Sequence, residues 1–343
     1  MTLSRAGSRS PSEPSTESLA DALTALCAEV GIPFEEMLQT VQSALAVAYV
    51  RAFNPPGEVR VRLDTGTGGL EVTSRVVAPD GTVTVNQLPA EDFKRLAAQT
   101  AKHAVLRHIH TLERDKVLRD VAEHKGELAS GVVDRSEAGT VYVDLGRAEG
   151  VMPPEEQIPG EQLHPGRPVL VLILETQRNP RQAQVRVSRA SRAFVHRLLE
   201  AEVPEIKAGT VEVRAIAREA GLRTKIAVST TEPGLDPVGA CVGPKGVRHR
   251  AILSELAGEH VDIVPWSEDA EAFVAASLGP AKADRVSIDR TTRTATVMVP
   301  RAQLSLAIGR DGQNARLAAK LTGFRIDIKA SDLESKGDGE GEG

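Results

Sequence analysis

The hydrophobic residues near the start of the chain recur at the spacing of an α-helix. With 3.6 residues per turn, one face of such a helix carries Met37, Leu38, Val41, Leu45 and Ala48. Pro33 suits the first turn, where its missing N–H is no loss. The run Asn54-Pro55-Pro56-Gly57 does not continue a helix. The pattern therefore predicts a helix that ends before residue 54.

The pattern then changes to alternating apolar and polar residues, which is typical of strands. Two such segments, Val59–Leu63 and Gly69–Val77, precede the turn Pro79-Asp80-Gly81. A second long helix is predicted from Ala90 to about Asp120, because neither proline nor glycine interrupts it. We therefore expect residues 18–123 to form an N-terminal α+β helical domain.

Short alternating strands with glycine-containing turns fill residues 124–190. The predicted strands are Ala129–Val133, Thr140–Leu145, Gly150–Met152, Pro168–Glu175 and Gln184–Ser188. Five short strands in so few residues fit a small closed β-barrel of the OB type. The stretches Gly131–Val133 and Val143–Gly146 resemble an S1 RNA-binding domain. Because Tyr142 is its only aromatic residue, we expect this barrel to bind RNA weakly.

The rest of the chain contains an internal repeat of helix, strand, strand, helix, Gly-x-x-Gly loop, helix and strand. This order is that of the bacterial-type (type II) KH domain, and we expect two of them in tandem, at residues 191–266 and 267–330. The first copy is Arg192–Ala201, Thr210–Ala217, Leu222–Ser229, a helix, Gly243–Gly246, a helix and Val261–Val264. The second copy is Glu271–Leu278, Arg285–Asp289, Thr294–Val299, a helix, Gly309–Gly312, a helix and Arg325–Lys329. The predicted fold class is thus multidomain α+β.

The two loops carry the chemistry expected for binding single-stranded RNA. Without Cβ atoms, glycines let a nucleic-acid backbone approach, and backbone N–H groups at the following helix start point towards its phosphates. Bases then lie in an apolar groove beside the loop. The candidate RNA-binding residues are Gly243, Pro244, Lys245, Gly246, Arg248, Gly309, Arg310, Asp311, Gly312, Gln313, Asn314 and Arg316.

These residues allow more than one interpretation. Both loops could be plain helix–helix turns, although their repetition in one order of elements favours binding. Gln313 and Asn314 could read a base edge or could cap the start of the helix. Asp311 lies inside the second loop and would repel phosphate, so we expect the second loop to bind more weakly than the first.

Charge is distributed unevenly along the chain. The 343 residues carry a formal net charge of −5, which argues against an indiscriminate polyanion binder. Residues 205–330, however, contain 18 Lys and Arg against 15 Asp and Glu, whereas residues 331–343 contain 1 against 5. The negative charge of the tail therefore masks, in the net charge of the whole chain, a mildly basic region that we expect to face RNA.

Both ends of the chain lack an apolar core. Residues 1–17 are rich in Ser, Pro, Thr and charge, so we expect a disordered arm, and residues 331–343 predict a disordered acidic tail. No run of about 18 apolar residues predicts a membrane span. We expect a cytoplasmic protein in which Cys27 and Cys241 are reduced, with Cys27 packed on an apolar helix face.

The sequence offers no pattern typical of an enzyme. No Ser/His/Asp set, Walker loop or spaced set of metal ligands is evident, so we expect no catalytic residues, no metal and no cofactor. His103, His108 and His110 lie on the second helix, but neighbours five and two residues apart do not share a helix face. We interpret them as solvated or packed side chains.

Several longer stretches resemble the NusA family of bacterial transcription elongation and termination factors. They are Ile32–Glu35, Val203–Ile206, Asp236–Gly243 and Ala307–Ala318, and the resemblance extends from about Leu19 to Ala330. The order of N-terminal domain, S1-type barrel and two KH domains is the same. The short Gly/Asp/Glu tail is similar to the actinobacterial arrangement, without the additional C-terminal repeats of some relatives.

The resemblance implies a monomeric factor that docks on RNA polymerase through its N-terminal domain. Its barrel and KH pair would hold the nascent single-stranded RNA, and it would modulate pausing, termination and antitermination together with other antitermination factors. One alternative is an RNA-degrading phosphorylase, which also combines KH and S1 domains, but in the opposite order and with a large catalytic core. Another is a ribosome-associated or RNA-processing protein that does not bind polymerase.

Overall fold

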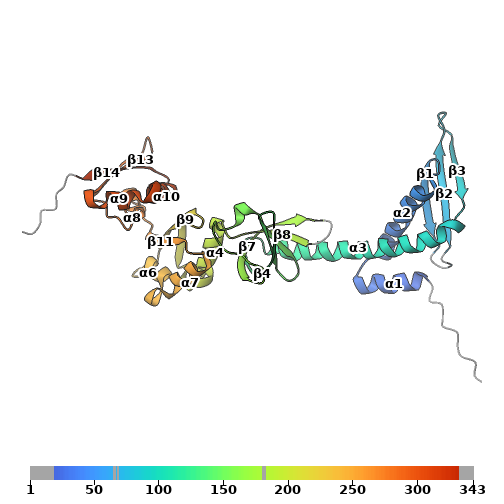
Figure 1. Ribbon diagram of the computed structural model, residues 1–343, viewed down its shortest axis with the longest axis horizontal. Helices are drawn as coiled ribbons and strands as arrows, with labels where there is room; N and C mark the ends of the chain where they lie inside the picture. Colours follow the sequence, from blue (N-terminus) through green and yellow to red (C-terminus); the bar gives the residue numbers. More distant parts are fainter. Residues whose placement is uncertain (1–18, 65–66, 68, 180–182, 332–343) are drawn as a thin grey trace, which may run out of the picture. The chain divides into compact units, whose positions relative to one another are not determined.

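The protein is described by a computed structural model over residues 19–64, 67, 69–179 and 183–331 (Figure 1). The predicted arm at residues 1–17 lies outside these residues. So does the predicted tail, apart from Ser331, which ends the last strand. The chain divides into two compact units, and the boundary between Lys116 and Val117 falls inside a long helix.

The N-terminal unit combines helices with a three-stranded antiparallel sheet of order β1-β2-β3 (Figure 1, blue to cyan). Its core brings together residues from the sheet and the helices, including Val61, Val72 and the ring pair Tyr49–Phe93 at 5.1 Å. Its elements are α1 (Leu19–Val30), α2 (Phe34–Phe53), β1 (Glu58–Leu63), β2 (Leu70–Val77), β3 (Val83–Leu88) and α3 (Lys94–Glu123).

Both long helices of this unit were predicted, and the structure confirms them. Helix α2 begins after Pro33 and ends at Asn54, whose left-handed backbone (φ 43°, ψ 50°) stops the helix. Helix α3 runs without interruption to Glu123. Strand β3 was not predicted. Its side chains are almost all exposed, so no buried alternation marks it, and it is held by its hydrogen-bond ladder to β2.

Both cysteines are free and buried, Cys27 in the N-terminal unit and Cys241 in the second unit. Cys27 packs with Leu23, Ile32 and Met37, so the prediction that it is a packing residue is confirmed. Burial raises the pKa of both thiols, and it raises the pKa of Cys241 to about 11.

We therefore expect Cys241 to resist alkylation in the folded protein. At pH 8 about one thiol in a thousand is ionised at such a pKa, against about one in four for a free cysteine, so alkylation should slow at least about 100-fold. Mass spectrometry after iodoacetamide treatment measures this, with glutathione as the free-thiol control. Complete labelling in guanidinium, and none without it, is the expected pattern. Native labelling at the rate of glutathione would contradict the buried position.

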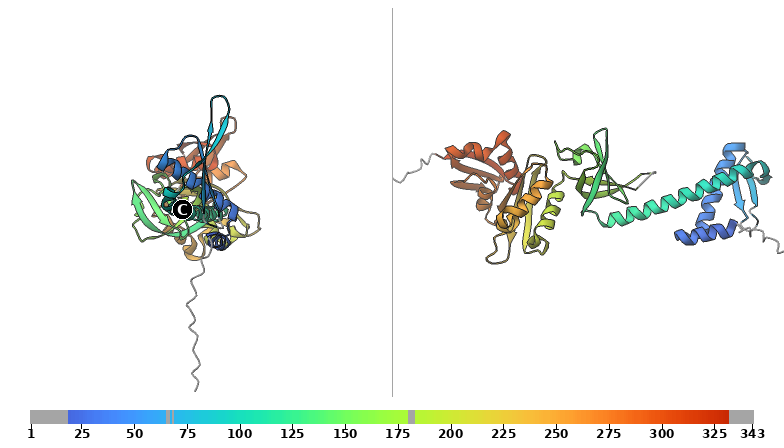
Figure 2. Two further views of the ribbon diagram at one scale, coloured as in Figure 1. Left: turned by 90° about the vertical axis from the view of Figure 1, so that its right-hand side faces the viewer. Right: turned by 60° about the horizontal axis from the view of Figure 1, so that its bottom comes forward.

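The second unit begins with a closed five-stranded barrel of strand order β4-β5-β6-β8-β7, as predicted (Figure 2, green). Its core is made of small aliphatic side chains such as Val143, Val171 and Val185, and the last turns of α3 pack against it through Val117, Leu118 and Val121. The strands are β4 (Leu128–Glu137), β5 (Thr140–Asp144), β6 (Glu149–Met152), β7 (Pro168–Arg178) and β8 (Ala183–Ser188).

The predicted repeat is present as two KH domains (Figures 1 and 2, yellow to red). In each, the last strand pairs parallel to the middle strand, giving sheets of order β11-β10-β9 and β12-β13-β14. The first contains α4 (Arg192–Glu202), α5 (Pro204–Lys207), β9 (Val211–Glu219), β10 (Arg223–Thr230), α6 (Pro237–Val242), α7 (Val247–Glu255) and β11 (His260–Pro265). The second contains α8 (Ala270–Ser277), β12 (Arg285–Asp289), β13 (Thr294–Pro300), α9 (Leu304–Ile308), α10 (Gln313–Thr322) and β14 (Arg325–Ser331).

Buried polar contacts join the barrel to the first KH domain and the first KH domain to the second. The Arg189 guanidinium, at the end of the barrel, pairs with Glu161 at 2.8 Å and donates to the Glu255 carbonyl at 2.7 Å. Buried Lys225 of β10 donates to Asp262 and to the Gly279 carbonyl of the second KH domain, each at 3.0 Å. The two loops are therefore carried on domains that contact each other directly.

Candidate nucleic-acid interface

The two Gly-x-x-Gly loops have nearly the same backbone conformation. Gly243 has φ 72° and ψ 172°, and Gly309 has φ 75° and ψ 173°. The closing glycines of both loops also have positive φ. A Cβ at Gly243 would lie 2.7 Å from the Arg248 Cγ, and a Cβ at Gly309 would lie 2.8 Å from the Asn314 Cβ. Glycine is thus required both for the turn and for the close approach of the following helix.

Aligning the loops on their glycines pairs Lys245 with Asp311. Both residues have the left-handed conformation, with φ 53° and ψ 24° for Lys245 and φ 52° and ψ 27° for Asp311. Pro244 corresponds to Arg310. The first loop therefore presents its cation at the third position, and the second loop presents a carboxylate there and its cation at the second. The two loops share a shape but not a charge pattern.

Lys245 and Arg310 are the exposed cations of the loops themselves. Both side chains face solvent, and no described residue forms an ion pair or hydrogen bond with either ammonium or guanidinium group. They are free to meet a phosphate without first breaking an internal contact.

Two of the predicted binding residues instead hold the loops in place. Asn314 is buried, and its Nδ2 donates to the Leu278 carbonyl at 2.9 Å and the Ala307 carbonyl at 3.0 Å. It thus satisfies backbone carbonyls near the ends of α8 and α9. With its side chain fully buried and its Nδ2 already bonded, Asn314 does not lie where the base-edge expectation would place it. The alternative, a cap at the start of α10, is wrong, since Gly312 occupies that position.

In the first copy Arg248 occupies the position that Asn314 occupies in the second. It also donates hydrogen bonds that hold its loop in place. Its Nη1 donates to the Ala240 carbonyl at 2.6 Å and to Glu205 at 2.8 Å. The pKa of Glu205 is lowered by a hydrogen bond to its own backbone and also by Arg248. Arg248 therefore ties the first loop to helix α5, and its charge is already paired.

Arg250 was missed in the sequence analysis. It is exposed, and its Nη1 donates to the Lys245 carbonyl at 2.7 Å. Arg316 makes the same interaction in the second copy, to the Asp311 carbonyl at 3.2 Å. Each arginine lies seven residues after the first glycine of its loop, so aligning the two copies on their glycines would have found Arg250.

Gln313 and Arg316 extend towards the first KH domain. The Gln313 Nε2 donates to Glu219 at 3.1 Å, and the Arg316 guanidinium contacts both oxygens of the same carboxylate. Apolar side chains beside each loop remain exposed: Val247 follows the first loop, and Ile308 precedes the second. They can provide the apolar surface on which bases lie.

Other parts of the chain offer less to a nucleic acid or a metal. On the barrel, Arg135 stacks 3.9 Å over the ring of Tyr142 and pairs with Asp134, Glu137 and Glu149.

Within the described ranges, no cluster of three or more His, Cys, Asp or Glu residues could hold a metal ion. Over the same ranges, no helix has both the length and the apolar character needed to cross a bilayer.

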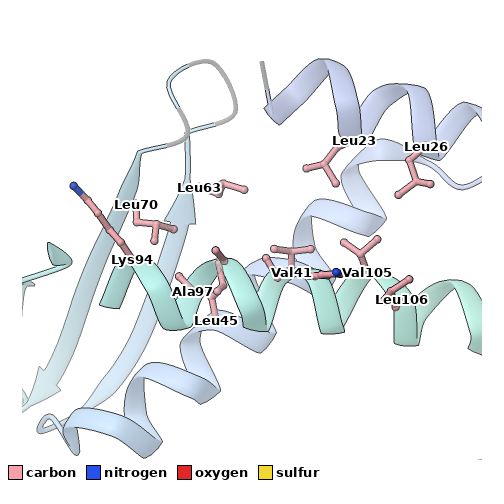
Figure 3. Close-up of a pocket in the computed structure, with 13 residues that line it drawn as sticks. Leu23, Leu26, Val41, Leu45, Leu63, Leu70, Lys94, Ala97, Val105 and Leu106 are labelled. Atoms are coloured by element: carbon pink, nitrogen blue, oxygen red, sulfur yellow. The ribbon is translucent and has the colours of Figure 1, made fainter. Parts of the chain in front are cut away.

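The N-terminal unit contains an apolar cavity of about 580 Å³. Figure 3 shows side chains from α1, α2, α3 and the ends of β1 and β2 around it. Among the described residues that line it, Lys94 and Lys102 are the charged ones; the others are apolar and include Leu23, Leu26, Val41, Leu45, Leu70 and Leu106. Such a lining suits apolar contact rather than acid–base chemistry.

Comparison with known proteins agrees with this architecture. Residues 189–266 match the NusA-like first KH domain, and residues 270–336 match the NusA-like second KH domain. The chain is 42% identical over 335 residues to the transcription termination/antitermination protein NusA of Bacillus subtilis, covering 91% of this chain and 90% of that protein. It is 41% identical over 319 residues to the protein of that name from Mycobacterium tuberculosis, covering 90% and 92%. The Thermus thermophilus protein is 34% identical over 347 residues, covering 91% and 90%. The chain therefore belongs to the NusA family of transcription termination/antitermination proteins.

Proposed function

We propose that this protein binds nascent single-stranded RNA and RNA polymerase together, and thereby modulates pausing, termination and antitermination without catalysing a reaction itself. The observation that carries the proposal is the pair of Gly-x-x-Gly loops of matching conformation in a chain that belongs to the NusA family over nearly its whole length. It would act in the cytoplasm, as a monomer, with other antitermination factors joining the complex.

The RNA would run along the two KH domains. Lys245, Arg250 and Arg310 would contact phosphates, because their charges face solvent beside the glycines. Bases would lie against Val247 and Ile308. This use of aliphatic surface suits a chain in which only 3% of residues are aromatic.

The N-terminal unit would provide the contact with RNA polymerase. It carries no Gly-x-x-Gly loop of this kind within its described residues, and its exposed large side chains include apolar ones such as Val47, Phe53 and Val85. Together with the apolar cavity between its helices and sheet, these side chains offer apolar surface for contact with another protein.

A pull-down in the presence of ribonuclease tests the proposal. Purified full-length chain should capture core RNA polymerase after ribonuclease treatment, and a chain beginning at residue 124 should not. The full-length chain should also bind a single-stranded RNA oligonucleotide in a filter-binding titration. Association with the small ribosomal subunit that persists at high salt, without capture of polymerase, would favour the ribosomal alternative.

A further inference from the structure

The carboxylate of Glu219 connects the first KH domain to the helix that follows the second loop. Glu219 ends β9, and three donors of α10 converge on it. Arg316 donates from Nε at 2.7 Å and from Nη2 at 2.9 Å, Gln313 donates at 3.1 Å, and Lys320 donates at 3.2 Å. The three donors lie at i, i+3 and i+7 of α10 and so share one helix face.

The interaction is ionic but its cations remain accessible. The Glu219 side chain is 17% exposed, whereas those of Arg316 and Lys320 are 48% and 52% exposed. The hydrogen bonds from Arg316, Gln313 and Lys320 lower the pKa of Glu219 to about 2, with Arg316 the largest cause, so the carboxylate stays charged at neutral pH. A second anion could therefore reach the same guanidinium from solvent, and it would compete with Glu219 for it.

The two copies differ in this respect. Arg250 and Arg316 each donate to the carbonyl of the third loop residue, Lys245 and Asp311. Among the described residues no carboxylate pairs with Arg250, whereas Arg316 is held by Glu219. The first loop thus has two available cations beside it. At the second loop, Asp311 and Glu219 offset the charges of Arg316 and Arg310.

We propose that Glu219 limits the RNA affinity of the second KH loop by withholding the Arg316 guanidinium from the RNA backbone. A phosphate can accept the same fork of N–H donors as a carboxylate, so Glu219 occupies the place that a phosphate would take. This inference rests on the proposed RNA binding by the loops. It makes the first loop the main anchor and the second loop a weaker, adjustable binding site.

Removing the charge of Glu219 should strengthen RNA binding. In the full-length chain, Glu219→Gln and Glu219→Ala should each lower the Kd for a labelled single-stranded RNA oligonucleotide by about three- to tenfold at low salt. The dependence of log K on log salt should steepen by about 0.7 for each further phosphate that the variant neutralises. Gln keeps an acceptor for Arg316 and so should have the smaller effect. Filter-binding titrations at several salt concentrations measure both quantities.

The matched control is Glu212→Gln, which removes the same charge from the same strand. Glu212 pairs with Arg214 at 3.0 Å, away from the loop donors, and its loss should leave the Kd within about twofold of wild type. The double variant Glu219→Gln/Arg316→Gln should not show the tighter binding. Thermal melting checks that all variants are folded.

The possible outcomes separate this inference from the proposed function. If the wild-type chain itself does not bind RNA, the proposed function fails. If the wild type binds but the Glu219 variants match Glu212→Gln or bind more weakly, only the role of Glu219 is overturned. Tighter binding that persists without Arg316 would overturn it as well, because the competition would not act through that guanidinium.

Discussion

Replacing Lys245 by Asp should weaken binding of single-stranded RNA by about tenfold or more at low salt. Asp311 shows that the third loop position accepts aspartate at almost the same φ and ψ, so the variant changes charge without straining the backbone. The substitution removes an exposed cation and places an anion beside the phosphates. Filter-binding titrations should give a salt slope smaller by about 0.7, as expected when one phosphate fewer is neutralised on a single strand.

The reciprocal change Asp311→Lys is the matched control. It gives the second loop the charge of the first, so it should tighten binding by a few-fold. Aspartate at Gly243 would be a less informative variant, because its Cβ would collide with Arg248 and the left-handed backbone would be strained as well. An unchanged affinity in both Lys245→Asp and Asp311→Lys would mean that the loops do not face the RNA backbone.

Most of the fold could be predicted because burial alternates along its elements. The barrel strands each place small aliphatic residues on the inside, and residues 140–144 show this alternation clearly. Strand β3 lacks it: Val83 and Val85 are exposed, and the strand depends on pairing with β2 instead. Its sequence does alternate, Val83 and Val85 with Thr82 and Thr84, but neither valine is buried, so the alternation there does not mark a core face.

The loops could be predicted because glycine spacing is a local property that occurs twice. The roles of individual side chains could not. Asn314 was expected to read a base edge or to cap the start of a helix, but its amide is buried and donates to carbonyls near the ends of α8 and α9. Arg316 is paired with Glu219, which lies 97 residues earlier in the chain. Such a pairing depends on how the two KH domains pack, and neither composition nor local spacing contains that information.

The buried ion pair between Arg218 of β9 and Glu259, which precedes β11, is the interaction whose loss should most reduce the stability of the first KH domain. The Arg218 and Glu259 side chains are 1% and 0% exposed. The Arg218 Nη2 lies 2.9 Å from Glu259, and its Nη1 donates to the carbonyls of Arg189 and Ser191 at 2.7 Å. Glu259 also accepts from the Gly221 N–H at 3.0 Å and from the Thr224 hydroxyl. Every polar group of the cluster thus has its partner inside the protein.

Glu259→Ala should lower the free energy of unfolding of the second unit by about 3–5 kcal/mol, because it leaves the Arg218 charge buried without a counterion. Glu212→Ala, which breaks an exposed pair in the same domain, should cost no more than about 1 kcal/mol. Urea denaturation followed by circular dichroism measures both. The double variant Arg218→Met/Glu259→Leu should recover only part of the loss. It removes the unpaired charge, but it leaves the Arg189 and Ser191 carbonyls, the Gly221 N–H and the Thr224 hydroxyl without these partners. A loss below about 1 kcal/mol for Glu259→Ala would mean that water reaches the Arg218 guanidinium and screens its charge.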